Sequence, residues 1–412
     1  MKRTAIAVSM CLGMAPSTAF ALDWSLNATD SETVELNSNQ FLKTSPAASV
    51  GSYTALSANA EARTPTSKFN FDGDGTYKKY WGPGVDGLAS EYLTYGFHAR
   101  YEMTEKGNFD REFVETKWRQ QSTALAILND LGVATPTSGF LDQLTASGGI
   151  DRSVSARDSL SLFATSTRTS YEPSSGGIPF TDTLARETWQ HRFSSITEGI
   201  ATSEVELLNF DNAFNTRIQI YRNQVGVNAT FSPVLSFRGN LGAAYLITDD
   251  GVSTLPSTGG PPLPVSSAVA DWIGDAALTY KMFRDTTLTI TANQSIGPSV
   301  VGSLFKRDSI IAGLAYTINS SSTLSFSASG NRQISTTTTD YASASVTYSY
   351  NFLREWSAQF TYRYQHRFAN SEGATIIDPL TNQPTVSGTG AADSHSIMAV
   401  VSHNLTILPR GN

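Results

Sequence analysis

The sequence predicts an all-β fold: a single antiparallel transmembrane β-barrel of about eighteen strands, with about sixteen as the alternative. The first observation is the segment 93–103, where odd positions are apolar or small and even positions are polar, charged or glycine. A period of two over about eleven residues is typical of a tilted strand that crosses a membrane with one wet face. The same alternation recurs along the chain between connections that are short and long in turn.

Composition supports the same fold class. Hydrophobic residues make up 40% of the chain and charged residues 16%, and much of the remainder is Ser, Thr, Gly and Asn. A soluble core of this size would need more Leu, Ile and Val. A barrel with a polar lumen needs fewer, because half of each strand faces water.

Residues 1–21 resemble a secretory signal, so we expect the barrel to occupy residues 22–412. Lys2 and Arg3 form the basic start, a short apolar run follows, and Ala19-Phe20-Ala21 has the form of a cleavage site. The only cysteine, Cys11, lies inside this signal. Removal of Lys2 and Arg3 changes the formal net charge from −7 to −9, which disfavours nucleic acid as a partner.

In the N-terminal third, strands are predicted near 24–28, at 52–62, from 68 onward and at 93–103. A loop at 37–49, a turn at 64–66 and an aromatic loop at 80–84 join them. Residues 113–123 fit a further strand, but 122–131 also fit a short helix, since Ala124, Ile127, Leu128 and Leu131 lie at helical spacing. We expect this helix to be a turn in an outer loop, with a helix folded into the lumen as the alternative.

The remaining strands follow regularly. They are predicted at 141–151, 159–170, 183–193, 199–210, 215–231, 235–247, 271–280, 287–295, 309–318, 323–331, 340–352, 356–365 and 394–405. A change of phase near Arg222-Asn223 predicts a β-bulge in the strand 215–231. Both chain ends fall on the side of the short turns, so the number of strands should be even.

The two kinds of connection predict the orientation. Outer-membrane barrels have short periplasmic turns and longer extracellular loops. We therefore expect the loops 249–265 and 366–392 on the cell surface and the turn 155–158 in the periplasm.

Three segments resemble a group of proteobacterial outer-membrane barrels associated with exopolysaccharide production and the PEP-CTERM system. They are the opening 22–35, the turn Ser155-Ala156-Arg157-Asp158-Ser159-Leu160 and the run Leu353-Arg354-Glu355-Trp356. The resemblance implies a barrel with a role in polymer export, and it carries no catalytic residue. Barrels of this kind end on an aromatic residue, whereas this chain ends Leu408-Pro409-Arg410-Gly411-Asn412.

Charged residues in mid-strand are the candidate functional residues. A charge that faces lipid at the membrane midplane costs about 2–4 kcal/mol, so these residues should line the lumen. They act either as ion pairs that stiffen the wall or as a lining that selects solutes. The assigned set is slightly basic, which predicts a weak preference for anions: Arg100, Glu102, Arg186, Arg217, Arg238, Asp275, Lys281 and Arg363.

The function predicted from these features is passive. We expect an outer-membrane channel for hydrophilic solutes, with export of an exopolysaccharide as the narrower form. The alternative is a closed structural or adhesive barrel that acts through its surface loops. The expected partners are outer-membrane lipid, the barrel assembly machinery and polysaccharide export components.

An enzyme is the third and least favoured reading. A membrane esterase or phospholipase would need Ser, His and a polar orienting group together, and Ser402, His403 and Asn404 are near each other in the sequence. Alternating strand faces separate these neighbours. The sequence therefore predicts no enzyme, no cofactor and no metal site.

Overall fold

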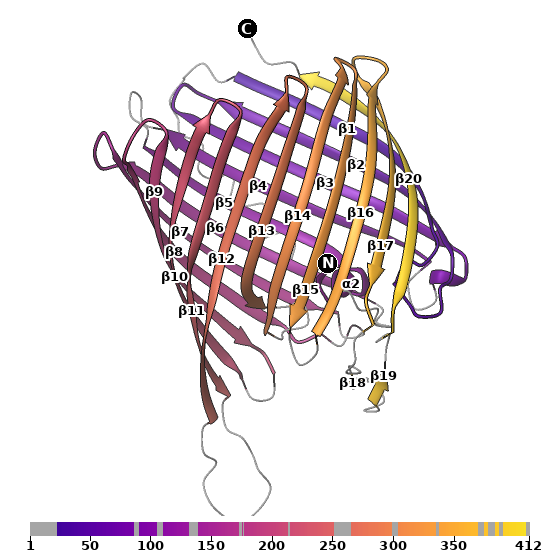
Figure 1. The fold of residues 1–412 in the computed structure, drawn as a ribbon. Helices are drawn as coiled ribbons and strands as arrows, with labels where there is room; N and C mark the ends of the chain where they lie inside the picture. The colour runs from indigo at the N-terminus through magenta and orange to yellow at the C-terminus, as the bar shows by residue number, and fades with distance from the viewer. Residues whose placement is uncertain are drawn as a thin grey trace, which may run out of the picture.

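Eighteen long antiparallel strands close into a single barrel in the computed structural model (Figure 1). Each strand pairs with the next in the barrel, and β1 also pairs with β20, so the sheet has no open edge. Closure pairs the strand edges with one another over most of their length, as a sheet in lipid requires. This confirms the predicted fold class and its even strand number.

The structure describes residues 23–408 except 86–89, 105–109, 132–138, 173–174, 176, 213–214, 251–264, 299–303, 335–337, 370–374, 378–383 and 387–389. The predicted signal 1–21 and most of the loop 249–265 lie outside the described residues.

The barrel strands are long, and each contains or overlaps one strand predicted from the alternation. Their bounds are β1 Asp23–Asn37, β2 Ser49–Arg63, β3 Ser67–Trp81, β4 Glu91–Thr104, β5 Arg111–Ser122, β6 Phe140–Ser153, β7 Asp158–Tyr171, β8 Phe180–Arg192, β9 Thr197–Phe210, β10 Arg217–Ser232, β11 Leu235–Asp250, β12 Val265–Phe283, β13 Thr286–Pro298, β14 Leu304–Asn319, β15 Ser322–Ile334, β16 Thr338–Asn351, β17 Trp356–Arg367 and β20 Ala392–Leu408.

Three smaller elements lie on the side of the longer loops. The 3-10 helix η2 spans Pro83–Val85. The two-stranded ribbon of β18 (Thr375–Ile377) and β19 (Pro384–Val386) lies inside the predicted loop 366–392. Helix α2 spans Thr123–Leu131 and begins where β5 ends. It lies in the connection between β5 and β6, and its buried Ala124 and Ile127 pack against the protein.

The outward face of the barrel is an apolar belt. Val225 is 69% exposed and Leu241 61% exposed, and these two residues lie opposite each other on β10 and β11. Antiparallel partners point to the same side, so the pairing extends this face to Phe237 and Tyr245 on β11. Such exposure of large apolar side chains is expected only where lipid covers them. The chain is therefore an outer-membrane β-barrel.

The bulge predicted near Arg222-Asn223 is wrong. Pairing of β10 with both neighbours runs without a break through these residues, and the register shifts only near the turn, between Thr230 and Ser232. The apparent change of phase arises because Asn223 lies on the outward face, in a polar row with Ser203 and Glu187. No helix in the described part of the chain is long and apolar enough to span a membrane.

Candidate functional site

The inward face of the barrel can be followed from strand to strand by its pairing. Glu102 lies opposite Phe113, which lies opposite Gly149, then Phe163, then Arg186. Partners in an antiparallel pair share a face, so these residues of β4–β8 all point into the lumen. The same rule assigns every residue discussed below.

The first charged cluster lies on β3, β4 and β5. Arg100 donates to Glu115 at 2.7 Å and to Glu102 at 3.2 Å. His98, one pair further along, contacts Asp72 at 3.1 Å and Glu115 at 3.3 Å. Alternation places these side chains on one face, and the strand pairing brings them within reach. Both the arginine and the two carboxylates that it contacts are about one-quarter exposed, so water reaches them from the lumen.

The second cluster, on β8, β9 and β10, is more deeply buried. Glu204 accepts from Arg186 at 2.6 Å and also from Arg222, and Arg222 donates in addition to Glu206. The side chains of Glu204 and Glu206 are only 8% and 5% exposed. Buried charges persist only when they are paired in this way, so the cluster ties three strands together.

A third contact joins the two ends of the sheet. Glu35 on β1 accepts from Tyr53 on β2 at 2.5 Å and from Arg363 on β17 at 3.5 Å. β20 lies between β17 and β1, so the second contact spans the closing strand. The ion pair therefore lies on the inner side of the seam where the barrel closes.

The pairing puts seven of the eight predicted lumen residues on the inward face. Arg100, Glu102, Arg186 and Arg363 belong to the clusters above. Asp275 accepts from the Asn240 amide at 3.0 Å, Arg238 lies opposite Ala277 on the same face, and Lys281 lies beside the turn.

Arg217 is the exception, and its predicted place in the lumen is wrong. It lies opposite Asn209 and Asp249 at the loop-side end of β10, on the face that carries Tyr221 and Val225. The prediction followed from the polar phase of the strand, on which Arg217 falls. Without the bulge, Ile218 and Ile220 point inward and Arg217 points outward.

Five carboxylates on the inward face were not among the predicted lumen residues. Glu35, Asp72, Glu115, Glu204 and Glu206 each pair with a basic group there. Each of these carboxylates offsets a basic group on the inward face. The alternation in each strand placed the carboxylates correctly, but only the register shows which arginine each one meets.

A second missed feature is an inward row of aromatic rings. Tyr53, Tyr80 and Tyr92 follow one another on β2, β3 and β4, with ring centroids 5.5 and 6.1 Å apart. Tyr80 and Tyr92 are buried, so they are packing groups rather than open stacking platforms.

The wall of β13, β15 and β16 is lined differently. In mid-strand the inward residues of these three strands are almost all hydroxyl-bearing, and neighbours bond to each other, as Ser329 and Ser343 do at 2.9 Å. The strand β14, between β13 and β15, instead places Ile311, Gly313 and Ala315 inward. The inward residues are Thr287, Thr289, Thr291, Thr323, Ser325, Ser327, Ser329, Ser343, Ser345, Thr347 and Ser349. These strands form the near side of the barrel in Figure 1, and the charged β4 and β5 lie on the far side.

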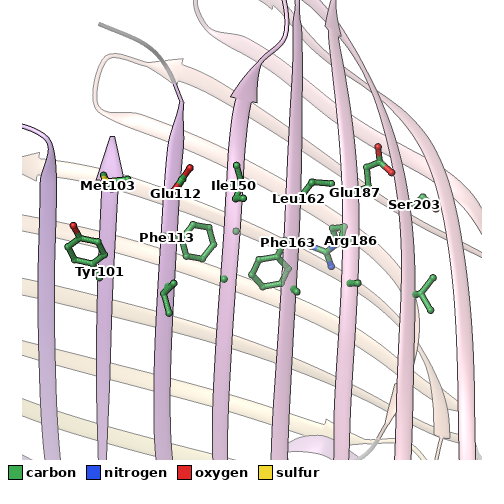
Figure 2. Close-up of a pocket in the computed structure, with 16 residues that line it drawn as sticks. Tyr101, Met103, Glu112, Phe113, Ile150, Leu162, Phe163, Arg186, Glu187 and Ser203 are labelled. Carbon is green, nitrogen blue, oxygen red and sulfur yellow. The ribbon is translucent and has the colours of Figure 1, made fainter. Parts of the chain in front are cut away.

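A hollow of about 760 Å³ along β4–β9 belongs to the outer surface (Figure 2). The register puts Val114, Ile150 and Leu162 of its lining outward, and the small Ala164 and Ala185 lie between them. A mainly apolar groove on the outward face suits a lipid chain, so it is separate from the lumen.

The structure offers no support for the hydrolase alternative at its one candidate position. Ser402 lies opposite Ser357 on the inward face, while His403 lies on the outward face and stacks on Trp356, with ring centroids 4.3 Å apart. Among the described residues, no group of three metal-binding side chains is found.

Comparisons with solved structures return outer-membrane proteins. OccAB2 of Acinetobacter baumannii is 11% identical and has a TM-score of 0.47, with 93% of this chain and 98% of that one covered. OpdL of Pseudomonas aeruginosa is 12% identical, with a TM-score of 0.48 and coverage of 94% and 99%. The ferric-catecholate import receptor Fiu of E. coli is 9% identical, with a TM-score of 0.48 and coverage of 93% and 82%.

These likenesses are too low to carry conclusions about function. No protein-family model and no curated protein matches the sequence. Assignment to the outer membrane follows from the closed barrel and its apolar belt, which lipid must cover.

Proposed function

We propose that the barrel is a passive channel for hydrophilic solutes in the outer membrane. The observation that carries this proposal is the inward face, which carries charged clusters on β3–β5 and β8–β10 and hydroxyl groups on β13, β15 and β16, while the outward face is an apolar belt. A wide barrel of this strand number leaves an aqueous lumen unless it is filled. Charged clusters on one side and hydroxyl groups on the other offer passing solutes hydrogen bonds.

The narrower proposal is export of an exopolysaccharide chain. The hydroxyl-lined wall of β13, β15 and β16 supports it, because such a surface bonds to sugar hydroxyls without the strong attraction of a fixed charge. On this proposal the protein works with polysaccharide export components, and the barrel assembly machinery inserts it.

A closed scaffold that acts through its surface loops is the second candidate. One observation favours it: an apolar cluster fills part of the loop-side lumen, with Leu208, Ile220 and Ile273 at its centre. A barrel packed in this way across its whole width would not conduct.

Conductance of the purified protein in a planar bilayer separates the two. A channel gives steady single-channel steps, and addition of a neutral oligosaccharide to one side blocks them if sugars enter. A protein that inserts and folds but gives no steps would overturn the channel proposal.

A further inference from the structure

The barrel wall separates between β12 and β13 near its loop-side end, while β14 stays paired with β15 as far as Lys306 opposite Ile334. Pairing of β12 with β13 reaches Gly274 opposite Gln294 and stops there, although β12 continues to Val265. β13 and β14 remain paired with each other as far as Pro298 opposite Leu304. The Gln294 amide donates to the Trp272 carbonyl at 3.2 Å, where the two strands part.

We call residues 294–298 and 304–307 the inner hairpin end. Had β13 continued in the wall, Ile296 would face lipid with Leu288 and Ile290. Instead Ile296 is 9% exposed and packs with Ile220 and Ile273, which point into the lumen. The inner hairpin end therefore lies inside the barrel, against the inner surface of β10–β12.

Apolar packing holds this second layer in place. The inward residues that it covers include Leu208, Ile218, Ile220 and Leu246, and Leu304 packs against the same cluster. Inward apolar side chains in a wet lumen would be unfavourable, and cover by the hairpin removes them from water.

Two polar contacts fix the layer to the wall. The Arg222 guanidinium donates to the Ile296 carbonyl at 2.6 Å, although β11 and β12 lie between their strands. Lys306 pairs with Asp271 at 2.7 Å, and Asp271 lies opposite Ala244 on the inward face of β12. Neither contact could form if the hairpin stayed in the wall.

We propose that the inner hairpin end is the constriction that sets the solute size limit of the channel. This rests on the proposed function, since a size limit has meaning only for a conducting barrel. A second layer inside the wall takes up lumen cross-section on the loop side. Ser295 and Arg307 lie opposite each other on β13 and β14, on the face of the hairpin that points away from β10–β12. Passing solutes therefore meet a hydroxyl and a guanidinium there.

The first test releases the hairpin through its ion pair. Lys306→Asp puts two carboxylates together and should increase single-channel conductance and admit larger neutral polymers. Asp271→Lys added to Lys306→Asp restores the pair with reversed signs and should return both quantities to wild type. Lys281→Asp is the matched control, because it changes the lumen charge equally at the turn, far from the hairpin. Equal effects of Lys306→Asp and Lys281→Asp, with no rescue by the reversed pair, would overturn the inference and leave the channel standing.

The second test needs no conduction. The sequence has one cysteine, Cys11, in the predicted signal, so introduced thiols in the mature barrel are unique. Ile296→Cys should be protected from a charged, water-soluble thiol reagent and become reactive when Lys306→Asp is added. Asn293→Cys, on the inward face just before the strands part, should react in both backgrounds. If Ile296→Cys stays protected in both, the residue faces lipid or a layer that the ion pair does not hold, and the inference fails. Absence of conductance with correct labelling would reject the channel function alone.

Discussion

Phe97 shows what one side chain contributes at the lipid face. It lies outward on β4, opposite Trp118, and the two rings stack with centroids 5.9 Å apart. Thr94, on the same strand, points inward opposite Thr76. The two positions therefore differ in the solvent that they meet.

We expect Phe97→Arg to destabilise the barrel by about 2–4 kcal/mol if the site is near the midplane, because it places a charge in hydrocarbon. Thr94→Arg should be nearly neutral. Folding yields into lipid vesicles measure both. Equal tolerance of the two substitutions would mean that β4 is not in a membrane.

Arg222 carries a larger share of the wall's stability. It neutralises Glu204 and Glu206, whose side chains are almost fully buried. Arg222→Met should lower the free energy of unfolding by about 3–5 kcal/mol, because it leaves two buried carboxylates without their positive partner. Adding Glu204→Gln and Glu206→Gln should recover part of that loss. Denaturant titration in vesicles checks the pair of variants, and an unchanged single variant would contradict the buried cluster.

At the scale of elements, β1 breaks the rule that the lipid face is apolar. Asp30 and Glu32 are exposed on the face that carries Val34 and Leu36, and Glu32 accepts only from the Thr54 hydroxyl, at 3.0 Å, among the contacts described. A carboxylate that faces lipid destabilises the barrel less than a basic residue does, but it is still destabilising.

Glu32→Leu should therefore stabilise the barrel, by about 1 kcal/mol. Glu35→Leu is the control on the same strand, because Glu35 points inward and accepts from Tyr53 and Arg363. That variant should destabilise. The midpoint of urea unfolding in vesicles shows whether each variant is more or less stable than wild type. A destabilising Glu32→Leu would indicate that another protein or water covers this part of β1.

The whole molecule sets the selectivity of the lumen. Arg100, Arg186 and Arg363 each form an ion pair with a carboxylate on another strand. The sequence alone did not identify these partners. Neutralised walls focus little field, so the channel should discriminate weakly between cations and anions. Arg238→Glu with Arg363→Glu should shift the reversal potential in a salt gradient towards cations. Strong selectivity in the wild type would show that the loops, and not the wall, set the field.

Orientation is also a property of the whole barrel. Protease added to intact cells should cut within the loops 249–265 and 368–392 and spare the turn 155–158, whose Ser155 backbone is bonded to Asp158. Cleavage at that turn alone would reverse the orientation.

The sequence by itself determined the strands and their faces. A period of two is a local property, so segments such as 93–103 revealed which side chains share a face before any pairing was known. It also placed seven of the eight charged residues on the inward side, because a charge in lipid is costly wherever the strand lies in the sheet.

Only the tertiary structure decided what those faces meet. The partner of each arginine depends on the register between strands, which alternation does not fix. Ile218 and Ile220 are apolar, yet they point inward under the end of hairpin β13–β14. A local sequence pattern shows only which side chains are apolar. It does not distinguish a side chain that faces lipid from one that a second protein layer covers, since both environments exclude water. That ambiguity produced the false bulge at Arg222 and the misplacement of Arg217.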